Sequence, residues 1–329
     1  MKKTWIVLIS MVFVLVLTGC GGPTREKSDG TIKVGISFHS MMNDVFTASE
    51  NYLKEFGAAS SPPVEFSVVV ADNDISKQTA DIKDIISKKP DVVAIVPEDS
   101  RAVEASIKDA HAANIPVVVY NRPVHPDVAE QPDCFVGIDS TDQGYASAKH
   151  VFQKMKDDGI DEINIVLVSG SLTDENSVNR SNGVNRAAKE FGANVLSDLP
   201  CDWDPELAAA NLPAALKAYP QCNVVFVSSD CMIPGVQTTL EDAGRWAPYG
   251  EPNHVYIASC DVFGVCLPLI EEGYIDADSL FDIVTQSKET VRVIKELAAG
   301  NKVEPIILVK GPVYTPENVN DPEMRSLLW

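Results

Sequence analysis

Polar side chains able to hydrogen-bond a small ligand follow an apolar run in the middle of the sequence. Residues 115–120 are mostly β-branched, and the run stops at Asn121 and Arg122, an amide and a planar guanidinium. Such a run is typical of a strand buried in a parallel sheet. Open α/β sheets bind ligands at the carboxyl ends of their strands, and a guanidinium suits paired oxygens. The stretch predicts one wall of a ligand site, with a strand followed by a solvated turn as the alternative.

Other apolar runs also end in hydrogen-bonding side chains. Each of these residues has a structural alternative, because Asn, Ser and Asp commonly cap helices and a lone arginine is usually at the surface. Together they indicate a polar crevice at one edge of the sheets. They are Asn43 and Asp44 after residues 32–37, Arg180 in the helical pattern after residues 163–168, Ser229 and Asp230 after residues 224–227, and Asp261 after residues 256–258.

Strand-like and helix-like segments alternate from residue 31 onward. This alternation predicts an α/β fold of parallel sheets with helices on both faces and right-handed crossovers. The strand-like runs are 32–37, 64–71, 91–96, 115–120, 134–138, 163–168, 193–196, 224–228, 254–258 and 303–308. The helix-like stretches are 44–56, 76–87, 100–112, 142–156, 176–191, 205–218, 233–243 and 288–299.

Length and charge narrow the classes of function. The chain has 329 residues, and a typical domain of about 150 residues predicts two domains. A hydrophobic fraction of 45% supplies ample core, and 22% charged residues is ordinary for a globular protein. The net charge of −20 repels phosphates, so nucleic acid is not an expected partner.

The first residues have the pattern of a secretion signal, and we expect them to lie outside the fold. Lys2 and Lys3 precede an apolar stretch over residues 5–17, which is short for a membrane span. The ending Leu17-Thr18-Gly19-Cys20 resembles a bacterial lipobox. That resemblance implies cleavage before Cys20 and a lipid on its sulfur, and residues 20–30 then form a tether. An ordinary signal, or a membrane helix with a chance cysteine, is the alternative.

Catalytic and metal-binding signatures are missing from the sequence. Six cysteines besides Cys20 are dispersed without a CxxC pair, and we expect mostly free, buried thiols. The five histidines are scattered, and neither a GxGxxG nor a Walker motif occurs. Residues 157–162 contain a fragment of a calcium loop, but a helix-to-strand turn fits them better. We therefore expect no metal, no cofactor and no enzymatic activity.

Seven short segments together carry a resemblance to one family. The chain resembles a type I periplasmic solute-binding protein of the sugar-binding branch, similar to the ribose- and galactose-binding proteins of ABC transporters. The segments are Lys33-Val34-Gly35-Ile36-Ser37 with Asn43 and Phe46, residues 115–122, Val136-Gly137-Ile138-Asp139 followed by Gly144, Asn179-Arg180-Ser181-Asn182-Gly183, Asp202-Trp203-Asp204, residues 225–230, and Cys260-Asp261.

The resemblance implies a two-lobe fold with the ligand in a cleft between the lobes. Each lobe is a parallel sheet with helices on both faces, and three crossing strands join them. After a signal peptide over residues 1–19 and the tether over 20–30, the first lobe spans 31–138 plus 282–310. The second lobe spans 139–281 plus 311–329.

The resemblance also assigns roles to individual residues. Phe46 and Trp203 would stack on the two faces of a sugar, and planar polar groups would bind its hydroxyls. Phe46 has the alternative of being a core residue. Phe281 stands near a position often occupied by glutamine, so it is included as a departure from the family pattern. The implied ligand-binding set is Asn43 or Asp44, Phe46, Asn121, Arg122, Arg180, Trp203, Ser229, Asp261 and Phe281.

These features predict a monomeric, lipid-anchored protein on the extracytoplasmic face of the membrane. It would capture a monosaccharide by hinge closure and deliver it to the membrane permease of an ABC importer. Departures at Val45, Asn121, Ser229 and Phe281 leave the sugar open and admit a non-sugar polyol or a nucleoside. A receptor that presents its ligand to a signalling or chemotaxis sensor is a second possibility. An enzyme using the cleft acids is disfavoured, because those carboxylates lack a clear partner or nucleophile.

Overall fold

Two six-stranded sheets form the framework of the computed structural model, which describes residues 30–328. The first sheet has the order β11-β5-β4-β3-β1-β2, and its strands pair in parallel. Its strands are β1 (Ile32–Phe38), β2 (Val64–Val70), β3 (Val92–Ile95), β4 (Val117–Tyr120), β5 (Cys134–Ile138) and β11 (Ile306–Val309).

The second sheet repeats this arrangement with one antiparallel edge. Its order is β12-β10-β9-β8-β6-β7, and only the β10–β12 pair runs antiparallel. Its strands are β6 (Asn164–Ser169), β7 (Asn194–Pro200), β8 (Val224–Val227), β9 (Tyr256–Asp261), β10 (Ala277–Leu280) and β12 (Val313–Tyr314).

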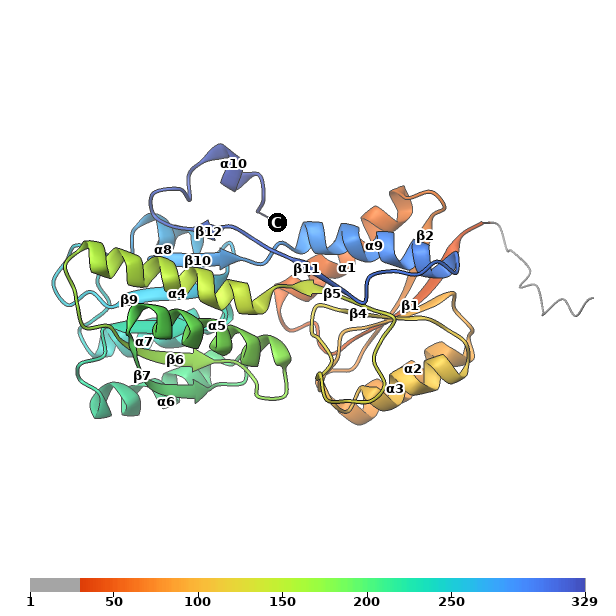
Figure 1. Ribbon diagram of the computed structural model, residues 1–329, viewed down its shortest axis with the longest axis horizontal. Helices are drawn as coiled ribbons and strands as arrows, with labels where there is room; N and C mark the ends of the chain where they lie inside the picture. Colours follow the sequence, from red (N-terminus) through yellow and green to blue (C-terminus); the bar gives the residue numbers. More distant parts are fainter. Residues whose placement is uncertain (1–29, 329) are drawn as a thin grey trace, which may run out of the picture. The chain divides into compact units, whose positions relative to one another are not determined.

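Helices cover both faces of the first sheet. In Figure 1, α1 (Asp44–Ala59) and α9 (Ile283–Ala298) lie on one side of this sheet, and α2 (Ile75–Ser87) and α3 (Glu104–Ala112) lie on the other. Within β3, Val92 and Ala94 join the core under α1 and α9, whereas Val93 and Ile95 join the core with α2 and α3. Alternate residues of a strand point to opposite faces, so a strand covered on both sides must be apolar throughout.

The second sheet is covered in the same way. One core cluster unites α4 (Ser140–Asp157) with α5 (Glu175–Phe191), and a separate cluster unites α6 (Pro205–Ala218), α7 (Ile233–Asp242) and α8 (Leu267–Glu271). A short 3₁₀ helix, η1 (Asp230–Met232), precedes α7, and α10 (Pro322–Arg325) lies near the end of the chain. Parallel sheets covered by helices on both faces confirm the expected fold class.

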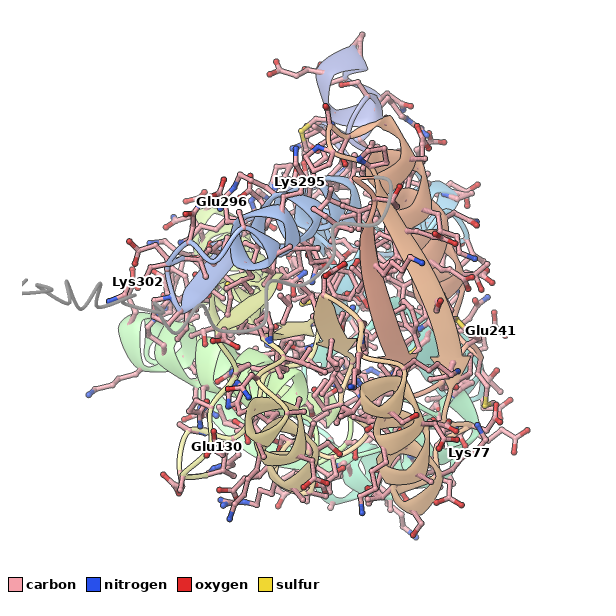
Figure 2. All side chains as sticks on the ribbon, turned by 90° about the vertical axis from the view of Figure 1, so that its right-hand side faces the viewer. Lys77, Glu130, Glu241, Lys295, Glu296 and Lys302 are labelled. Atoms are coloured by element: carbon pink, nitrogen blue, oxygen red, sulfur yellow. The ribbon has the colours of Figure 1, made fainter. Side chains whose placement is uncertain are left out.

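Charged side chains lie on the outer helices and loops. Figure 2 labels Lys77 on α2, Glu241 on α7, and Lys295 and Glu296 on α9. Among the described residues, no helix combines the length and apolarity needed to cross a membrane. The signal peptide, Cys20 and all of the tether except Gly30 lie outside the described residues.

The chain crosses between the two sheets three times. It leaves β5 for α4, returns from β10 to α9, and leaves β11 for β12. On this basis we propose the lobe limits stated above, with residues 31–138 and 282–310 in the first lobe. Residues 139–281 and 311–329 make up the proposed second lobe.

Some expected boundaries are wrong. The strands β10 and β12 and the short helices were not expected, and α9 begins at Ile283 rather than residue 288. The sequence of β10 is Ala-Asp-Ser-Leu, and it lacks the apolar signal of a buried strand because two of its four buried residues are polar. Asp282 caps α9 by accepting from Thr285 N, which explains the earlier start of that helix.

Strand order identifies the edge where a ligand would bind. In each sheet the first strand of the lobe lies between the second and the third, so the connections on its two sides run in opposite directions. Such a switch point leaves a crevice at the carboxyl ends of the strands. His39 follows β1, Asn121 follows β4, Ser229 follows β8, and Asp261 ends β9. Asn121, Ser229 and Asp261 therefore occupy the edge predicted from the sequence, and His39, which was not expected, lies there too.

Candidate functional site

A buried arginine on α5 organises the second-lobe half of the site. Arg180 is 3% exposed. Its Nε and Nη2 donate to Gln143 Oε1 at 3.1 and 2.9 Å, and its Nη1 donates to the carbonyl of Ser228 at 2.5 Å. Nη2 also donates to Asp261 Oδ1 at 2.6 Å. The guanidinium is therefore fixed by the protein in one orientation.

Two glycines allow the helices that carry Arg180 and Gln143 to approach each other. A Cβ on Gly144 would meet the carbonyl oxygen of Arg180 at 2.2 Å, and a Cβ on Gly183 would meet the carbonyl oxygen of Thr141 at 2.2 Å. Backbone contacts at these distances tolerate no larger residue. The small residues of α4 and α5 therefore place Gln143 against Arg180.

Asp261 ends β9 and is 4% exposed. Its Oδ1 accepts from Arg180 and its Oδ2 accepts from the hydroxyl of Ser229. Burial raises the pKa of this carboxyl, while the charge of Arg180 and the bond from Ser229 oppose that rise. Asp261 thus belongs to a polar network and does not cap the following helix, which was its structural alternative.

Two further carboxyls lie behind Asp261. Asp230 accepts from Ser259 Oγ at 2.5 Å and from the Phe263 amide at 2.7 Å, and Asp278 accepts from the Val262 amide at 3.2 Å. Burial and the charge of Asp261 raise the pKa of Asp230 to about 6, and burial and Asp230 raise that of Asp278 well above its usual range. The expectation that Asp230 caps a helix is wrong, because Ser229 caps η1 and Asp230 is buried.

Trp203 lies directly before the cap of α6. Its backbone has a φ of +64°, and Asp204 caps the helix by accepting from Glu206 N. The indole packs against Gly170 so closely that a Cβ there would lie 2.4 Å from Trp203 ring carbons. Arg180 Cζ is 5.8 Å from the Trp203 ring centroid. The buried Trp203 Nε1 has no hydrogen-bond partner among the described residues.

Phe281 follows β10 and is nearly buried. Its ring centroid lies 6.0 Å from Arg180 Cζ. Although Phe281 follows a strand of the second sheet, it packs in the core cluster of the first. Its ring is therefore next to the guanidinium at a point where the chain passes between the lobes.

Phe46 organises the first-lobe half of the site. It is buried on the first turns of α1, and its ring centroid lies 4.3 Å from that of His39 and 5.9 Å from Arg122 Cζ. Asn43 caps α1 by accepting from Val45 N, whereas Asp44 is exposed in the first turn. Of the two alternatives considered for this loop, Asn43 is therefore the capping residue.

Arg122 and Asn121 reach residues of the second lobe. Arg122 Nε lies 2.9 Å from Asp174 Oδ2, and Asn176 Nδ2 donates to the carbonyl of Asn121 at 3.1 Å. Asp174 also caps α5 by accepting from Asn176 N. Asn121 adopts a left-handed backbone with a φ of +68°, which asparagine tolerates better than most residues. The start of α5 thus contacts the end of β4.

The structure adds four residues that the sequence analysis missed. Gln143 and Asp174 hold the two arginines, and His39 and Glu98 lie near Arg122. Asp174 carried a detectable signal, since it directly precedes a helical pattern. Gln143 and Glu98 carried none, because their roles depend on contacts between distant segments.

The arrangement suits recognition of a small hydroxylated molecule. Trp203 Nε1, His39 Nδ1 and Glu98 Oε2 are buried polar atoms without a hydrogen-bond partner among the described residues. Burial raises the pKa of the Cys231 thiol to about 12 and also raises that of Cys260, which disfavours thiolate nucleophiles beside the site. Within residues 30–328, no group of three or more His, Cys, Asp or Glu side chains is placed to hold a metal ion.

Comparison with known proteins assigns the family. The sequence model of a periplasmic binding protein domain matches residues 34–302, which is most of the chain. The chain belongs to this periplasmic binding protein family. Members of the family are binding proteins rather than enzymes, and they work outside the cytoplasm.

Individual relatives bind sugars and polyols. The chain is 24% identical to the xylitol-binding protein of Mycolicibacterium smegmatis over 309 residues, covering 92% of this chain and 83% of the relative. It is 25% identical to the ribose import binding protein of Bacillus subtilis over 253 residues, covering 74% and 79%. An ABC transporter solute-binding protein from Bacillus halodurans with bound myo-inositol is 25% identical with a TM-score of 0.78, covering 90% of this chain and 98% of that one.

These comparisons confirm the expected type I periplasmic binding protein fold and the sugar-binding branch of the family. The relatives and structural neighbours are solute-binding proteins for sugars and polyols.

Proposed function

We propose that this protein captures one small sugar or polyol between its two lobes and delivers it to an ABC importer. The sugars and polyols bound by the relatives and the polar groups at the strand ends support this ligand class. Cys20 carries the lipid that anchors the protein, which acts as a monomer on the extracytoplasmic face of the membrane. The membrane permease of the importer is its protein partner.

The network around Arg180 is the observation that carries this proposal. It contains a fixed guanidinium, the Asp261 carboxyl group and a hydroxyl at Ser229, with the Trp203 indole beside them. A sugar ring presents hydroxyls at its rim and C–H groups on its faces. Charged hydrogen-bonding groups favour the rim, and an aromatic surface favours the faces.

We propose that residues of both lobes contact the ligand. Phe46 and Trp203 would cover its apolar faces, while Asp44 is the weakest candidate because it is exposed. Gln143 and Asp174 act as positioning residues for the two arginines. The full proposed set is Asn43, Asp44, Phe46, Asn121, Arg122, Arg180, Trp203, Ser229, Asp261 and Phe281.

Contacts across the lobes support closure around the ligand. Besides the Arg122–Asp174 pair, the Ser100 amide donates to the carbonyl of Thr173 at 3.1 Å. Both contacts join loops that follow strand ends of different sheets. Hinge closure between lobes would make and break them, and that motion encloses the ligand.

A thermal-shift screen of the purified full-length protein tests this function. The protein is held in a detergent without a sugar headgroup, and the panel contains pentoses, hexoses, inositols, acyclic polyols and nucleosides. A ligand that binds only the folded state raises the midpoint of unfolding by mass action. We expect a strong shift with one or a few sugars or polyols, recovered chemically unchanged. No shift across the whole panel would contradict the proposal, and turnover of the ligand would contradict a pure binding role.

A further inference from the structure

The charged groups of the proposed binding site do not balance. Each arginine is already paired with a carboxylate, since Arg122 Nε lies 2.9 Å from Asp174 and Arg180 Nη2 lies 2.6 Å from Asp261. Asp174 is itself satisfied, because its Oδ1 accepts from Asn176 N and its Oδ2 faces Arg122. A further negative group in this region would therefore have no arginine of its own.

Glu98 is that further negative group. It follows β3 at the same sheet edge, between the ends of β1 and β4. Its backbone amide donates to Gln78 Oε1 at 2.9 Å, which fixes the start of the loop. The side-chain Oε2 is buried without a hydrogen-bond partner among the described residues. Burial raises the pKa of Glu98, the charge of Arg122 lowers it, and the charge of Asp174 raises it further. Glu98 therefore shares the positive charge of Arg122 with Asp174.

His39 gives an independent indication of a ligand contact beside Arg122. His39 directly follows β1 and is 3% exposed. Its Nδ1 has no hydrogen-bond partner among the described residues. Burial, with the charge of Arg122 second, lowers its pKa well below the usual range, so the ring is neutral and adds no positive charge. An uncharged imidazole against Phe46 provides one polar atom for a ligand without offsetting Glu98.

A carboxylate oxygen without a donor, Glu98 Oε2, determines which ligand groups can bind beside it. A carboxylate oxygen can only accept hydrogen bonds, so its partner must be a hydroxyl or an N–H group. Leaving such an oxygen unpaired costs free energy, and a charged donor offsets this more strongly than a neutral one. A ligand carboxylate or phosphate would instead add a further negative charge beside Glu98 and Asp174.

We propose that Glu98 makes this site select its ligand by charge. The site prefers a polyol that carries a protonated amine over the neutral analogue, and it rejects acidic analogues. The inference rests on the proposed function, because it concerns the same site. It narrows the ligand class from sugars and polyols in general to aminated ones.

The test uses sets of ligands that share a carbon skeleton and differ in one functional group and its charge. D-glucosamine, D-glucose and D-glucuronate form one set, and 2-amino-1,3-propanediol, glycerol and glycerate form a second. Binding to the full-length protein is measured at pH 7 by calorimetry in phosphate buffer, because Tris is itself an aminated polyol. We expect the amine of at least one set to bind about tenfold or more tightly than its neutral analogue, with no binding of either acid.

Variants then test the role of Glu98. Glu98→Gln keeps the size of the side chain and removes its charge, so the preference for the amine should disappear while neutral ligands still bind. Glu55→Gln removes a charge from the exposed face of α1 in the same lobe and should leave the preference intact. The wild-type comparison does not depend on whether either variant folds.

The outcomes separate this inference from the proposed function. The charge preference is overturned if neither amine binds more tightly than its neutral analogue, if an acid binds as well as the amine, or if Glu98→Gln keeps the wild-type order. The proposed function survives those results as long as a neutral sugar or polyol binds. Silence of every sugar and polyol in the wider panel overturns both.

Discussion

Arg180 and Asp261 are joined at 2.6 Å although they stand 81 residues apart in the sequence. One lies on α5 and the other at the end of β9, and both are almost fully buried. Gln143 from α4 accepts from the same guanidinium, and Ser229 donates to the other oxygen of the same carboxylate. The pair is thus held from four elements, which gives the ligand a preorganised surface.

Gln143 should act on the ligand through Arg180. Gln143→Leu preserves side-chain volume but removes the acceptor of two guanidinium bonds. A buried charged group that loses its partners costs about 1 to 3 kcal/mol or more. We expect ligand affinity to fall about tenfold or more, because the guanidinium is no longer fixed. Calorimetric titration measures the affinity, and Gln153→Leu on the exposed side of α4 is the matched control. Equal affinity in Gln143→Leu and wild type would show that Arg180 is positioned without Gln143.

Gly170 should control the position of the Trp203 ring. Gly170→Ala places a methyl group 2.4 Å from Trp203 ring carbons, so the indole must move. The expected result is a large loss of ligand binding, measured by thermal shift, with the protein still folded by circular dichroism.

Gly264→Ala serves as the control for that substitution. Nothing lies within 4 Å of a Cβ at Gly264, so this change should leave binding near the wild-type level. If Gly170→Ala binds ligand as well as Gly264→Ala does, the Trp203 ring is not part of the site.

The ion pair between Arg122 and Asp174 should stabilise the ligand-bound form. Asp174→Asn retains a good helix cap but removes the charge that faces Arg122. We expect affinity to fall about tenfold, since charged hydrogen bonds contribute about 1.5 to 3 kcal/mol. Asp74→Asn makes the same change at the exposed cap of α2 and should have no effect. A loss of affinity in both variants would point to a general charge effect instead of the pair.

The buried acids should make stability depend on pH. Burial and Asp230 raise the pKa of Asp278 well above its usual range, and that of Asp230 is raised to about 6. Above about pH 4 these two carboxyls therefore hold more protons in the folded protein than in the unfolded chain, and their contribution makes the free energy of unfolding fall as pH rises. Asp278→Asn removes one of these groups. Because it lacks a group whose pKa is raised on folding, the variant should gain stability relative to wild type as pH rises above about 4.

Denaturant unfolding at several pH values measures that gain. Asp161→Asn is the control, because the Asp161 side chain is fully exposed. Its free energy of unfolding should change with pH in the same way as that of wild type. A difference between Asp278→Asn and wild type that stays constant with pH would show that Asp278 titrates normally in the folded protein.

Local sequence patterns predicted the features that depend on neighbouring residues. The apolar runs located most strands, because a strand covered on both faces must be apolar at successive positions. The polar residues after those runs, among them Asn121, Ser229 and Asp261, lie at the predicted sheet edge. The fold class was accessible from this information, and the family was predicted from the resemblance that the seven short segments carry.

Features that depend on distant contacts were not predictable in the same way. The polar strand β10 was missed because a buried carboxyl, that of Asp278, is not expected inside a strand. Asp278 accepts a hydrogen bond from the Val262 amide, a contact that no local pattern predicts. In the sequence, Gln143 cannot be distinguished from any other polar residue of a helix, and its role becomes visible only when the fold places Arg180 beside it. Asp230 was interpreted as a cap because its local context fits one, whereas its partners Ser259 and Phe263 come from another segment.

Calorimetric titration tests ligand capture at this site most directly. The strongest ligand from the screen is titrated into wild type, Trp203→Ala and Trp246→Phe. Trp246 stacks on Tyr274 in the second lobe, at a ring-centroid distance of 4.9 Å, and serves as the control. We expect wild type and Trp246→Phe to bind one ligand per chain, and Trp203→Ala to lose at least tenfold in affinity, which corresponds to about 1.4 kcal/mol or more. Full affinity in Trp203→Ala would contradict ligand capture at this site.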